Sequence, residues 1–373
     1  MAEFFNVLPP AEACAVWLAQ VAHRAGVELI APLEALGRVT AQPLLSPEAL
    51  PAFARSTVDG YAVRAADTFG ASDSLPAYLT VAGEVPMGQA ASVAVAKGQA
   101  VLIHTGGMIP PGADAVVMVE HTQLFGDGEI EVLRPVAPGE NVLQVGEDVV
   151  MGAEVLPAGH RIQPQDIGAL LALGLASEIA VVRRPRVCLF SSGDELVPPS
   201  TRDLKPGQIR DINSGTIASL CLQAGAAPEI RGILPDEAEA FYDALAAALP
   251  DADLLVVTAG SSVSVRDMTA RTINRLGAPG VLVHGVAARP GKPTILAAVD
   301  GKPVIGLPGN PVSALVMFSL FGVPAIAHLL GADAPLQVRT PARVTVNVPS
   351  SAGRDDYVPV RLVQRDGEQW AEP

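Results

Sequence analysis

Acidic, hydroxyl-bearing and glycine residues follow an apolar run near the middle of the sequence. Ser191, Ser192 and Gly193 offer hydroxyl and backbone donors that suit a phosphate or another oxyanion. Asp194 and Glu195 come next and supply the hard oxygen ligands that Mg²⁺ prefers. A turn with an aspartate cap is the alternative interpretation.

Two further segments have the same character. Asp211, Asn213 and Ser214 precede a predicted helix, so Asn213 or Ser214 is expected to be its N-cap, which is compatible with an anion site there. After another apolar run, three serines would form a nest of donors, and the aspartate that follows would open the next helix as a cap or as a catalytic acid. These residues are Ser261, Ser262, Ser264 and Asp267.

Cations occur beside a rigid proline-glycine turn, although the chain as a whole is acidic. Arg289 and Lys292 flank this turn, and a fixed pair of cations suits a doubly charged tetrahedral oxyanion. A second such turn leads to Ser313, which would present its hydroxyl and amide at a helix start. Rigid surface turns are the alternative for both segments. The second turn consists of Pro308, Gly309 and Asn310.

The first half of the chain adds two candidate catalytic residues. Asp59 stands beside a glycine turn, and Thr105 follows a predicted strand and precedes two glycines that would let a ligand approach the backbone. His104 is more consistent with a structural role, because no second histidine stands at a metal-ligand spacing. The sequence contains no nucleophile elbow, phosphate-binding P-loop or paired cysteines, which disfavours hydrolases of those classes.

The elements that position these residues follow from periodicity. Helices are predicted over 11–22 and 161–176, with Val-rich runs and turns between them that are typical of a β-rich insert. From residue 186, apolar strands alternate with helices, which indicates a doubly wound, mostly parallel α/β domain. The strands are expected at 187–190, 254–257, 281–283 and 304–307, and the helices at 212–224, 237–249 and 269–276.

The predicted fold is therefore multidomain, α/β plus β, with a helical and β N-terminal region, a β-rich insert, an α/β domain and a small C-terminal β-domain. Strands are expected at 338–348 and 357–363 in the last of these. The domain boundaries are 1–44 with 151–182 for a discontinuous linker domain, 45–150 for the insert, 183–332 for the α/β domain and 333–373 for the C-terminal domain.

Composition limits the function classes. The chain has 373 residues, of which 49% are hydrophobic, and its net charge of −14 argues against nucleic-acid or anionic-membrane surfaces. Cys14, Cys188 and Cys221 lack paired spacing, which fits a reducing cytoplasm. No signal peptide is evident. Residues 314–332 contain no Asp, Glu, Lys or Arg, and we expect a buried helix there rather than a membrane span.

Taken together, these segments resemble the molybdopterin molybdenumtransferases, the MoeA-type proteins related to the gephyrin E-domain. The resemblance covers about residues 10–330 and consists of seven motifs in the family's order. They are Ser56–Ala62 for Ser-x-Met-Asp-Gly-Tyr-Ala, Thr105-Gly106, Gly146-Glu147-Asp148, Gly193–Leu196, Asp211-x-Asn213, Pro290–Pro293 and Pro308–Ser313.

Some positions depart from the family pattern. Ser261 and Ser262 replace two glycines, and Arg289 replaces a lysine, which keeps the charge. The C-terminal β-domain is shorter than in relatives.

The resemblance implies that molybdate and adenylylated molybdopterin are converted to molybdenum cofactor and AMP with Mg²⁺. It implies a homodimer whose active site is shared between subunits, and contact with the adenylyltransferase and acceptor molybdoenzymes is expected. Mg²⁺ would bind Asp59, Glu195 or Asp211, and molybdate would bind Ser264, Lys292 and Ser313 with Arg289. The competing hypotheses are a molybdopterin adenylyltransferase and a gephyrin-type scaffold.

Overall fold

The computed structural model describes residues 7–259, 263–333 and 339–373, without the side chains of 263–266. The described chain forms two compact units. The first contains residues 1–42, 158–167 and 177–373, and the second contains 43–157 with 168–176. A β-rich insert thus interrupts a unit whose parts are far apart in sequence. The finer expected division, with a separate linker domain, stays a prediction.

The first unit is built on a mixed sheet with strand order β17-β14-β18-β22-β21-β19. The first four strands are parallel, and the last two run antiparallel to their neighbours. The mostly parallel α/β fold expected from the sequence is confirmed. The strands are β14 (Arg186–Ser192), β17 (Ala227–Leu234), β18 (Leu254–Ala259), β19 (Pro279–His284), β21 (Ile295–Val299) and β22 (Lys302–Pro308).

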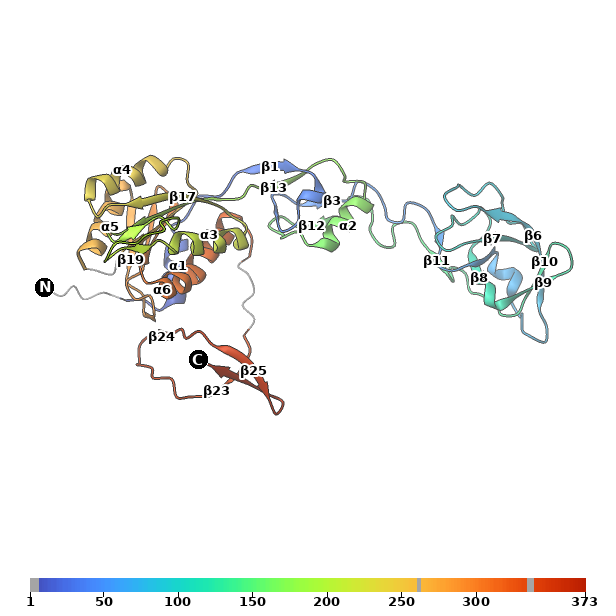
Figure 1. Cartoon of the computed structure of the whole chain (residues 1–373). Coiled ribbons are helices and arrows are strands. Elements are labelled where there is room, and N and C mark those ends of the chain that lie inside the picture. Colours follow the sequence, from blue (N-terminus) through green and yellow to red (C-terminus); the bar gives the residue numbers. More distant parts are fainter. Residues whose placement is uncertain (1–6, 260–262, 334–338) are drawn as a thin grey trace. The chain divides into compact units, whose positions relative to one another are not determined.

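Helices cover both faces of this sheet because successive strand residues point to opposite sides (Figure 1). Val187 and Leu189 of β14 pack with the helices of one face, whereas Cys188 and Phe190 pack with those of the other. The first face carries α1 (Pro10–Leu18), α3 (Asn213–Ala224), α6 (Pro311–Met317) and α7 (Val323–Leu329), and the second carries α4 (Ala238–Ala248) and α5 (Val263–Leu276).

Two strands of this sheet were not predicted, and two of the helices that cover it differ in extent from the prediction. β17 lies at the sheet edge and carries charged Glu229 and Arg231, so it has no apolar run. β21 is short and rich in alanine, which weakens its strand signal. Helix α1 ends earlier than expected, at Leu18, and α5 starts before 269, at Val263.

The amino-terminal helix is fixed to the sheet by Trp17. Its side chain is fully buried, and its indole Nε1 donates a 2.7 Å hydrogen bond to the carbonyl of Ala297 in β21. Because Trp needs a partner for its N–H when buried, this bond completes an otherwise apolar contact. The amino-terminal helix is therefore packed against a strand that lies 280 residues later in the chain.

The apolar segment near the end of the α/β region is helical throughout. α6, the π-helical η4 (Phe318–Gly322) and α7 follow one another without a break. Among the described residues, Pro311–Leu329 is the one helical segment long and apolar enough to cross a membrane. However, 56% of its most apolar window is buried, and Met317, Phe318 and Phe321 are fully inside the core. This agrees with the expectation of a buried helix.

The linker strands form a small sheet in the order β1-β13-β2, made of Val27–Ile30, Ile179–Val182 and Val39–Thr40. Helix α2 (Pro164–Ala172) is shorter than the helix predicted over 161–176. It begins at Pro164, where the carboxylate of Asp166 accepts the amide of Gln163 at 2.7 Å.

The second unit is β-rich, with strand order β8-β5-β7-β6-β10-β9 in its main sheet. Tyr61, Leu79, Val117 and Ile130 lie in its core. These strands are β5 (Gly60–Val63), β6 (Ala77–Val85), β7 (Gln99–Ile103), β8 (Ala115–Met118), β9 (Thr122–Phe125) and β10 (Glu129–Val132). Two small pairs join β4 (Arg55–Ser56) to β11 (Val142–Leu143) and β3 (Leu44–Leu45) to β12 (Glu154–Leu156).

The C-terminal β-domain is a small sheet in the order β23-β26-β25. Its strands are β23 (Arg343–Val344), β25 (Arg361–Arg365) and β26 (Glu368–Glu372). A further strand, β24 (Asp355–Asp356), pairs with β20 (Ala288–Arg289) of the α/β region. The long strand predicted over 338–348 is wrong in extent: within its described part only Arg343–Val344 pairs, with Trp370 and Ala371 of β26. The strand predicted at 357–363 begins later, at Arg361.

A buried carboxylate joins the linker strands to the sheet. Asp253, 2% exposed, accepts 2.7 and 2.8 Å hydrogen bonds from the Arg183 guanidinium, one of 2.7 Å from the Arg186 amide, and lies 2.7 Å from His23 Nε2. Burial raises the pKa of Asp253, but the hydrogen bonds from Arg183, His23 and Arg186 outweigh it and hold that pKa below its ordinary value. Arg183 follows β13 and His23 precedes β1, so both connections to the linker meet here.

We predict that Asp253→Asn lowers the free energy of unfolding by about 3 kcal/mol, the lower end for breaking a buried ion pair, since Arg183 is partly exposed. Because the folded pKa is depressed, this stabilisation is present above the ordinary aspartate pKa and is lost as pH falls through the folded value. Urea unfolding at pH 7 and at pH 3 measures both effects. Asp251→Asn, at a side chain 63% exposed, is the control and should change little.

Candidate active site

The parallel strands end together at one edge of the sheet. Ser192 at the end of β14 is in register with Ala259 of β18 and Leu234 of β17, and Ala259 is in register with Pro308 of β22. The segments selected from the sequence after β14, β18 and β22 therefore leave the sheet side by side. Ligands of such sheets bind outside these carboxyl ends.

A buried chain of hydrogen bonds lies directly beneath this edge. Thr258 Oγ1 donates to Ser191 Oγ at 3.2 Å, and Ser191 Oγ donates to Asp211 Oδ2 at 2.8 Å. The other oxygen of Asp211 accepts the amide of Ser214 at 3.2 Å. Asp211 is 4% exposed, so it holds Ser191 and the start of α3 in place. The N-cap expected at Asn213 or Ser214 is wrong, because the Asp211 carboxylate caps the helix instead.

A second hydroxyl of this edge is also held by an aspartate. Ser192 Oγ donates to a carboxylate oxygen of Asp236, and the Asp236 amide is 3.5 Å from Asp194 Oδ1. Sequence reasoning missed Asp236, because it follows the unpredicted strand β17. Thr258 was missed too, although it lies within an apolar strand and in register with Ser191.

Glu195 is exposed and its carboxylate folds back over Gly193. A Cβ atom at Gly193 would lie 2.8 Å from Glu195 Oε2, so a larger residue there would displace the carboxylate. Asp194 is also exposed. The loop after β14 thus presents two carboxylates to solvent next to the hydroxyl of Ser192.

The starts of α3 and α6 are connected across this edge. Asn213 Nδ2 donates to the carbonyl of Gly309 at 2.8 Å. Asn310 caps α6, and its Oδ1 lies 3.3 Å from the amide and 3.4 Å from the hydroxyl of Ser313. Four of the residues chosen from the sequence are therefore brought together, and Ser313 lies mostly buried beside its cap.

The positive charge of Lys292 lies at the same edge because β21 runs antiparallel to β22. Ile295 at the start of β21 pairs with Gly306 near the end of β22, so Lys292 just before it lies at the carboxyl edge. Gly291 allows the turn to approach α6, since a Cβ atom there would lie 2.4 Å from Met317 Cγ. Arg289, Lys292 and Arg354 line one cavity of about 490 Å³. Sequence reasoning missed Arg354, which has no motif around it.

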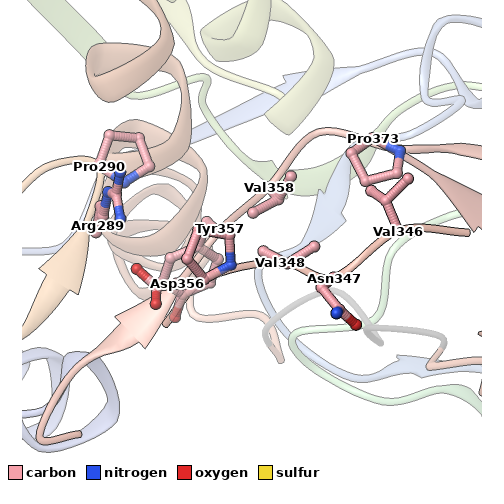
Figure 2. Close-up of a pocket in the computed structure, with 10 residues that line it drawn as sticks. Arg289, Pro290, Val346, Asn347, Val348, Asp356, Tyr357, Val358 and Pro373 are labelled. Atoms are coloured by element: carbon pink, nitrogen blue, oxygen red, sulfur yellow. The ribbon is translucent and has the colours of Figure 1, made fainter. Parts of the chain in front are cut away.

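The C-terminal β-domain contributes to a neighbouring cavity of about 370 Å³ (Figure 2). Arg289 and Pro290 line one side of it, and residues of the C-terminal β-domain, among them Asp356, Tyr357 and three valines, line the rest. The Tyr357 amide donates to the Arg289 carbonyl at 2.7 Å, which attaches this segment to β20. Hydrogen bonding from Ser350 and the charges of Arg354 and Arg289 hold the pKa of Asp356 below its ordinary value. Asp356 therefore stays ionised beside these cations.

The candidates of the segment after β18 are not brought into the hydrogen-bonded site at this edge by any described contact. Ser261 and Ser262 lie outside the described residues, as does the side chain of Ser264, whose backbone belongs to α5. Asp267 lies in the second turn of α5, so the expectation that it opens the helix is wrong. It lines a surface depression with Arg271, apart from the hydrogen bonds described above.

In the second unit, Asp59 and Thr105 form a pair. Asp59 Oδ1 accepts the amide of Thr105 at 2.8 Å and its hydroxyl at 3.1 Å. The amide bond and then the hydroxyl bond, helped by the nearby charge of His104, hold the pKa of Asp59 below its ordinary value. His104 also lies 3.2 Å from Glu84. Position 60 requires glycine, because a Cβ atom there would lie 1.9 Å from the Val117 carbonyl oxygen.

No group of three or more His, Cys, Asp or Glu side chains could hold a metal ion among the residues that the structure describes. Asp59 belongs to one unit, and Glu195 and Asp211 belong to the other. The carboxylates chosen from the sequence are thus single ligands that would need other oxygens beside them.

Comparisons with known proteins cover nearly the whole chain. A family model described as "MoeA N-terminal region (domain I and II)" matches residues 8–174, and one described as "Probable molybdopterin binding domain" matches residues 188–328. The chain is 37% identical to molybdopterin molybdenumtransferase 2 of Mycobacterium tuberculosis, over 87% of this chain and 80% of that protein. It is 35% identical to the molybdopterin molybdenumtransferase of Bacillus subtilis, over 93% and 80%.

A solved structure is similar throughout. The crystal structure of the molybdopterin biosynthesis protein moeA from Pyrococcus horikoshii matches with a TM-score of 0.84 and 34% identity, over 98% of this chain and 90% of that one.

We predict that Thr105→Val raises the pKa of Asp59 part of the way to its ordinary value. The substitution removes the hydroxyl bond to the carboxylate and keeps the stronger amide bond, so the shift is reduced and not abolished. An NMR titration of the Asp59 carboxyl carbon measures it. Thr122→Val is the matched control, since the Thr122 hydroxyl donates to the Val119 carbonyl. An unchanged Asp59 pKa in Thr105→Val would contradict the assignment.

Proposed function

The chain belongs to the MoeA family of molybdopterin molybdenumtransferases, enzymes of molybdenum cofactor biosynthesis, and we propose that it transfers molybdenum from molybdate to adenylylated molybdopterin with release of AMP. One observation carries the proposal. The register of β14, β18 and β22 gathers hydroxyls, exposed carboxylates and a lysine at one edge of the sheet. That combination suits a substrate with a phosphoanhydride and a second, oxyanionic substrate beside it.

The adenylylated substrate would bind at the loop after β14. Gly193 would offer a backbone amide to the phosphates. The Ser192 hydroxyl, which donates to Asp236, and the buried Thr258–Ser191–Asp211 chain fix the loop from below. Holding the groups in a fixed geometry reduces the entropy lost on reaching the transition state. Among the described residues of this edge, the Ser191 and Ser192 hydroxyls are buried and donate to aspartates, so positioning and electrostatics would supply the rate enhancement.

Molybdate would bind in the cavity lined by Arg289, Lys292 and Arg354. Molybdate is a tetrahedral dianion, and guanidinium and ammonium groups bind such oxyanions through charge-assisted hydrogen bonds. Asp356 neutralises part of the local positive charge, since its Oδ1 lies 3.1 Å from Arg354 Nε. Because Asp356 offsets part of the positive charge, the cavity would bind molybdate less tightly than three uncompensated cations would, and molybdate could still dissociate.

Mg²⁺ is proposed as the metal of the reaction. Proteins usually bind Mg²⁺ with one or two carboxylates, and substrate phosphates and waters complete the shell, which fits single exposed carboxylates. Glu195 and Asp59 would hold it, whereas both oxygens of Asp211 already accept hydrogen bonds. When bound, Mg²⁺ would neutralise the negative charge of the phosphoanhydride as AMP leaves.

A homodimer with a shared active site would bring the two proposed metal ligands together, because Asp59 and Glu195 belong to different units of one chain. Exposed apolar side chains on α6 support an interface: Val312 and Leu315 are 46% and 39% exposed. A cytoplasmic location and contact with the adenylyltransferase and acceptor molybdoenzymes complete the proposal.

We predict that Lys292→Ala raises the molybdate concentration for half-maximal AMP release roughly tenfold, equivalent to about 1.5 kcal/mol for a charge-assisted bond at an exposed site. Saturating molybdate should restore most of the rate. Lys302→Ala is the control, because Lys302 lies at the opposite end of β22 and donates to the carbonyls of Leu249 and Pro250. A loss that no molybdate concentration restores would place Lys292 at another substrate.

A mixing experiment tests the shared site. Asp59→Asn and Glu195→Gln proteins should each be inactive, and mixing with subunit exchange should restore about a quarter of the wild-type rate. Half of the dimers are then hybrids, and each hybrid keeps one intact site of two. If both ligands came from the same subunit, mixing would restore nothing. A scaffold without catalysis would be indifferent to both substitutions.

A further inference from the structure

A small cavity of about 250 Å³ lies at the far end of α3, away from the candidate active site. It is formed where the linker strands meet the last turn of that helix. Three arginines line it, and none of its lining residues within the described chain is acidic. They are Arg38, Arg161 and Arg184, with Leu36, Gly37, Val39, Leu222, Gln223, Gly225 and Leu330.

Arg161 forms the inner wall of this arginine pocket. Its Nη1 donates to the carbonyl of Gly37 at 2.9 Å, and its Nη2 lies 3.3 Å from the carbonyl of Ala224 at the end of α3. It is partly buried, and burial lowers its pKa. Gly225, with φ of 95°, leaves room, since a Cβ atom there would lie 3.1 Å from Arg161 Nη1. Neutral carbonyls thus hold the guanidinium without balancing its charge.

The other two arginines differ from each other. Arg38 forms an ion pair with Glu28 and donates to the Val182 carbonyl at 2.9 Å, so its charge is compensated. Arg184 is exposed, and neither it nor Arg161 forms an ion pair with any residue that the structure describes. Two positive charges therefore face one pocket uncompensated, in a chain whose net charge is −14.

We propose that the arginine pocket binds a phosphate dianion, either free or as the phosphate of a small ester. Two uncompensated charges match the charge of about −2 that a phosphate carries near neutral pH. Guanidinium groups present planar pairs of donors that fit phosphate oxygens, and Arg161 has donors left beyond its two carbonyl bonds. A volume of about 250 Å³ lies below the range of pockets for larger ligands, roughly 300–1,000 Å³.

This pocket is separate from the proposed molybdenum-transfer site. Asp211 and Asn213 form their hydrogen bonds with Ser214 and Gly309 at the start of α3. The pocket lies at the end of this helix, 12 residues later. At 1.5 Å per residue, the helix separates the two sites by about 18 Å. The inference therefore does not rest on the proposed function, and either can fail alone.

Isothermal titration of the full chain with inorganic phosphate tests the pocket. We expect a phosphate site in the wild type that Arg184→Gln and Arg161→Gln each weaken at least tenfold. Arg271→Gln removes an exposed charge of α5 and should bind phosphate as the wild type does. Lys292→Ala should also bind it normally, which separates this pocket from the proposed molybdate site. Titration with glycerol 3-phosphate distinguishes the sources, because tighter binding identifies an ester site and weaker binding identifies free phosphate.

The Arg184→Gln variant decides the question if Arg161→Gln proves unstable, because Arg184 is exposed and makes no side-chain hydrogen bond to the described chain. Phosphate affinity equal to wild type in Arg184→Gln would overturn the proposal. So would the absence of phosphate binding to the wild type, or a site that disappears in Lys292→Ala instead.

Discussion

Strand register is the constraint on which the candidate site depends. β14, β18 and β22 are parallel neighbours, so Ser192, Ala259 and Pro308 end at the same level although 116 residues separate the first from the last. The antiparallel β21 adds the turn with Lys292 to this edge from the opposite direction. A one-residue slip of β14 would turn Ser191 away from Thr258 and remove the support of Asp211.

Close approach of backbone to its neighbours fixes the loops at this edge. Gly291 lets the cationic turn contact Met317 of α6, and Gly193 lets the Glu195 carboxylate fold back beside Ser192. The buried hydroxyls and the Asp211 carboxylate then leave few conformations open to the loop after β14. Rigid support of this kind is what a site needs when positioning, and not a reactive nucleophile, supplies the rate.

The sequence was sufficient for the parallel core and for the loops that follow its strands, because apolar runs and glycine-rich turns are local signals. It was insufficient for Thr258, Asp236 and Arg354. Thr258 lies inside a buried strand, and Asp236 follows an edge strand without an apolar run. Arg354 belongs to the C-terminal β-domain and reaches the site beside the short pairing of β20 with β24. Each takes part through a contact made in space, which no spacing in the sequence encodes.

The buried bond from Trp17 to Ala297 has a consequence for synthesis of the chain. The two residues are 280 positions apart, so the amino-terminal helix has no partner for its indole until β21 has emerged from the ribosome. Until then Trp17 and the apolar face of α1 remain open to water and to other chains. Contacts of such high sequence separation form slowly, and the interval exposes apolar surface to aggregation or to chaperones.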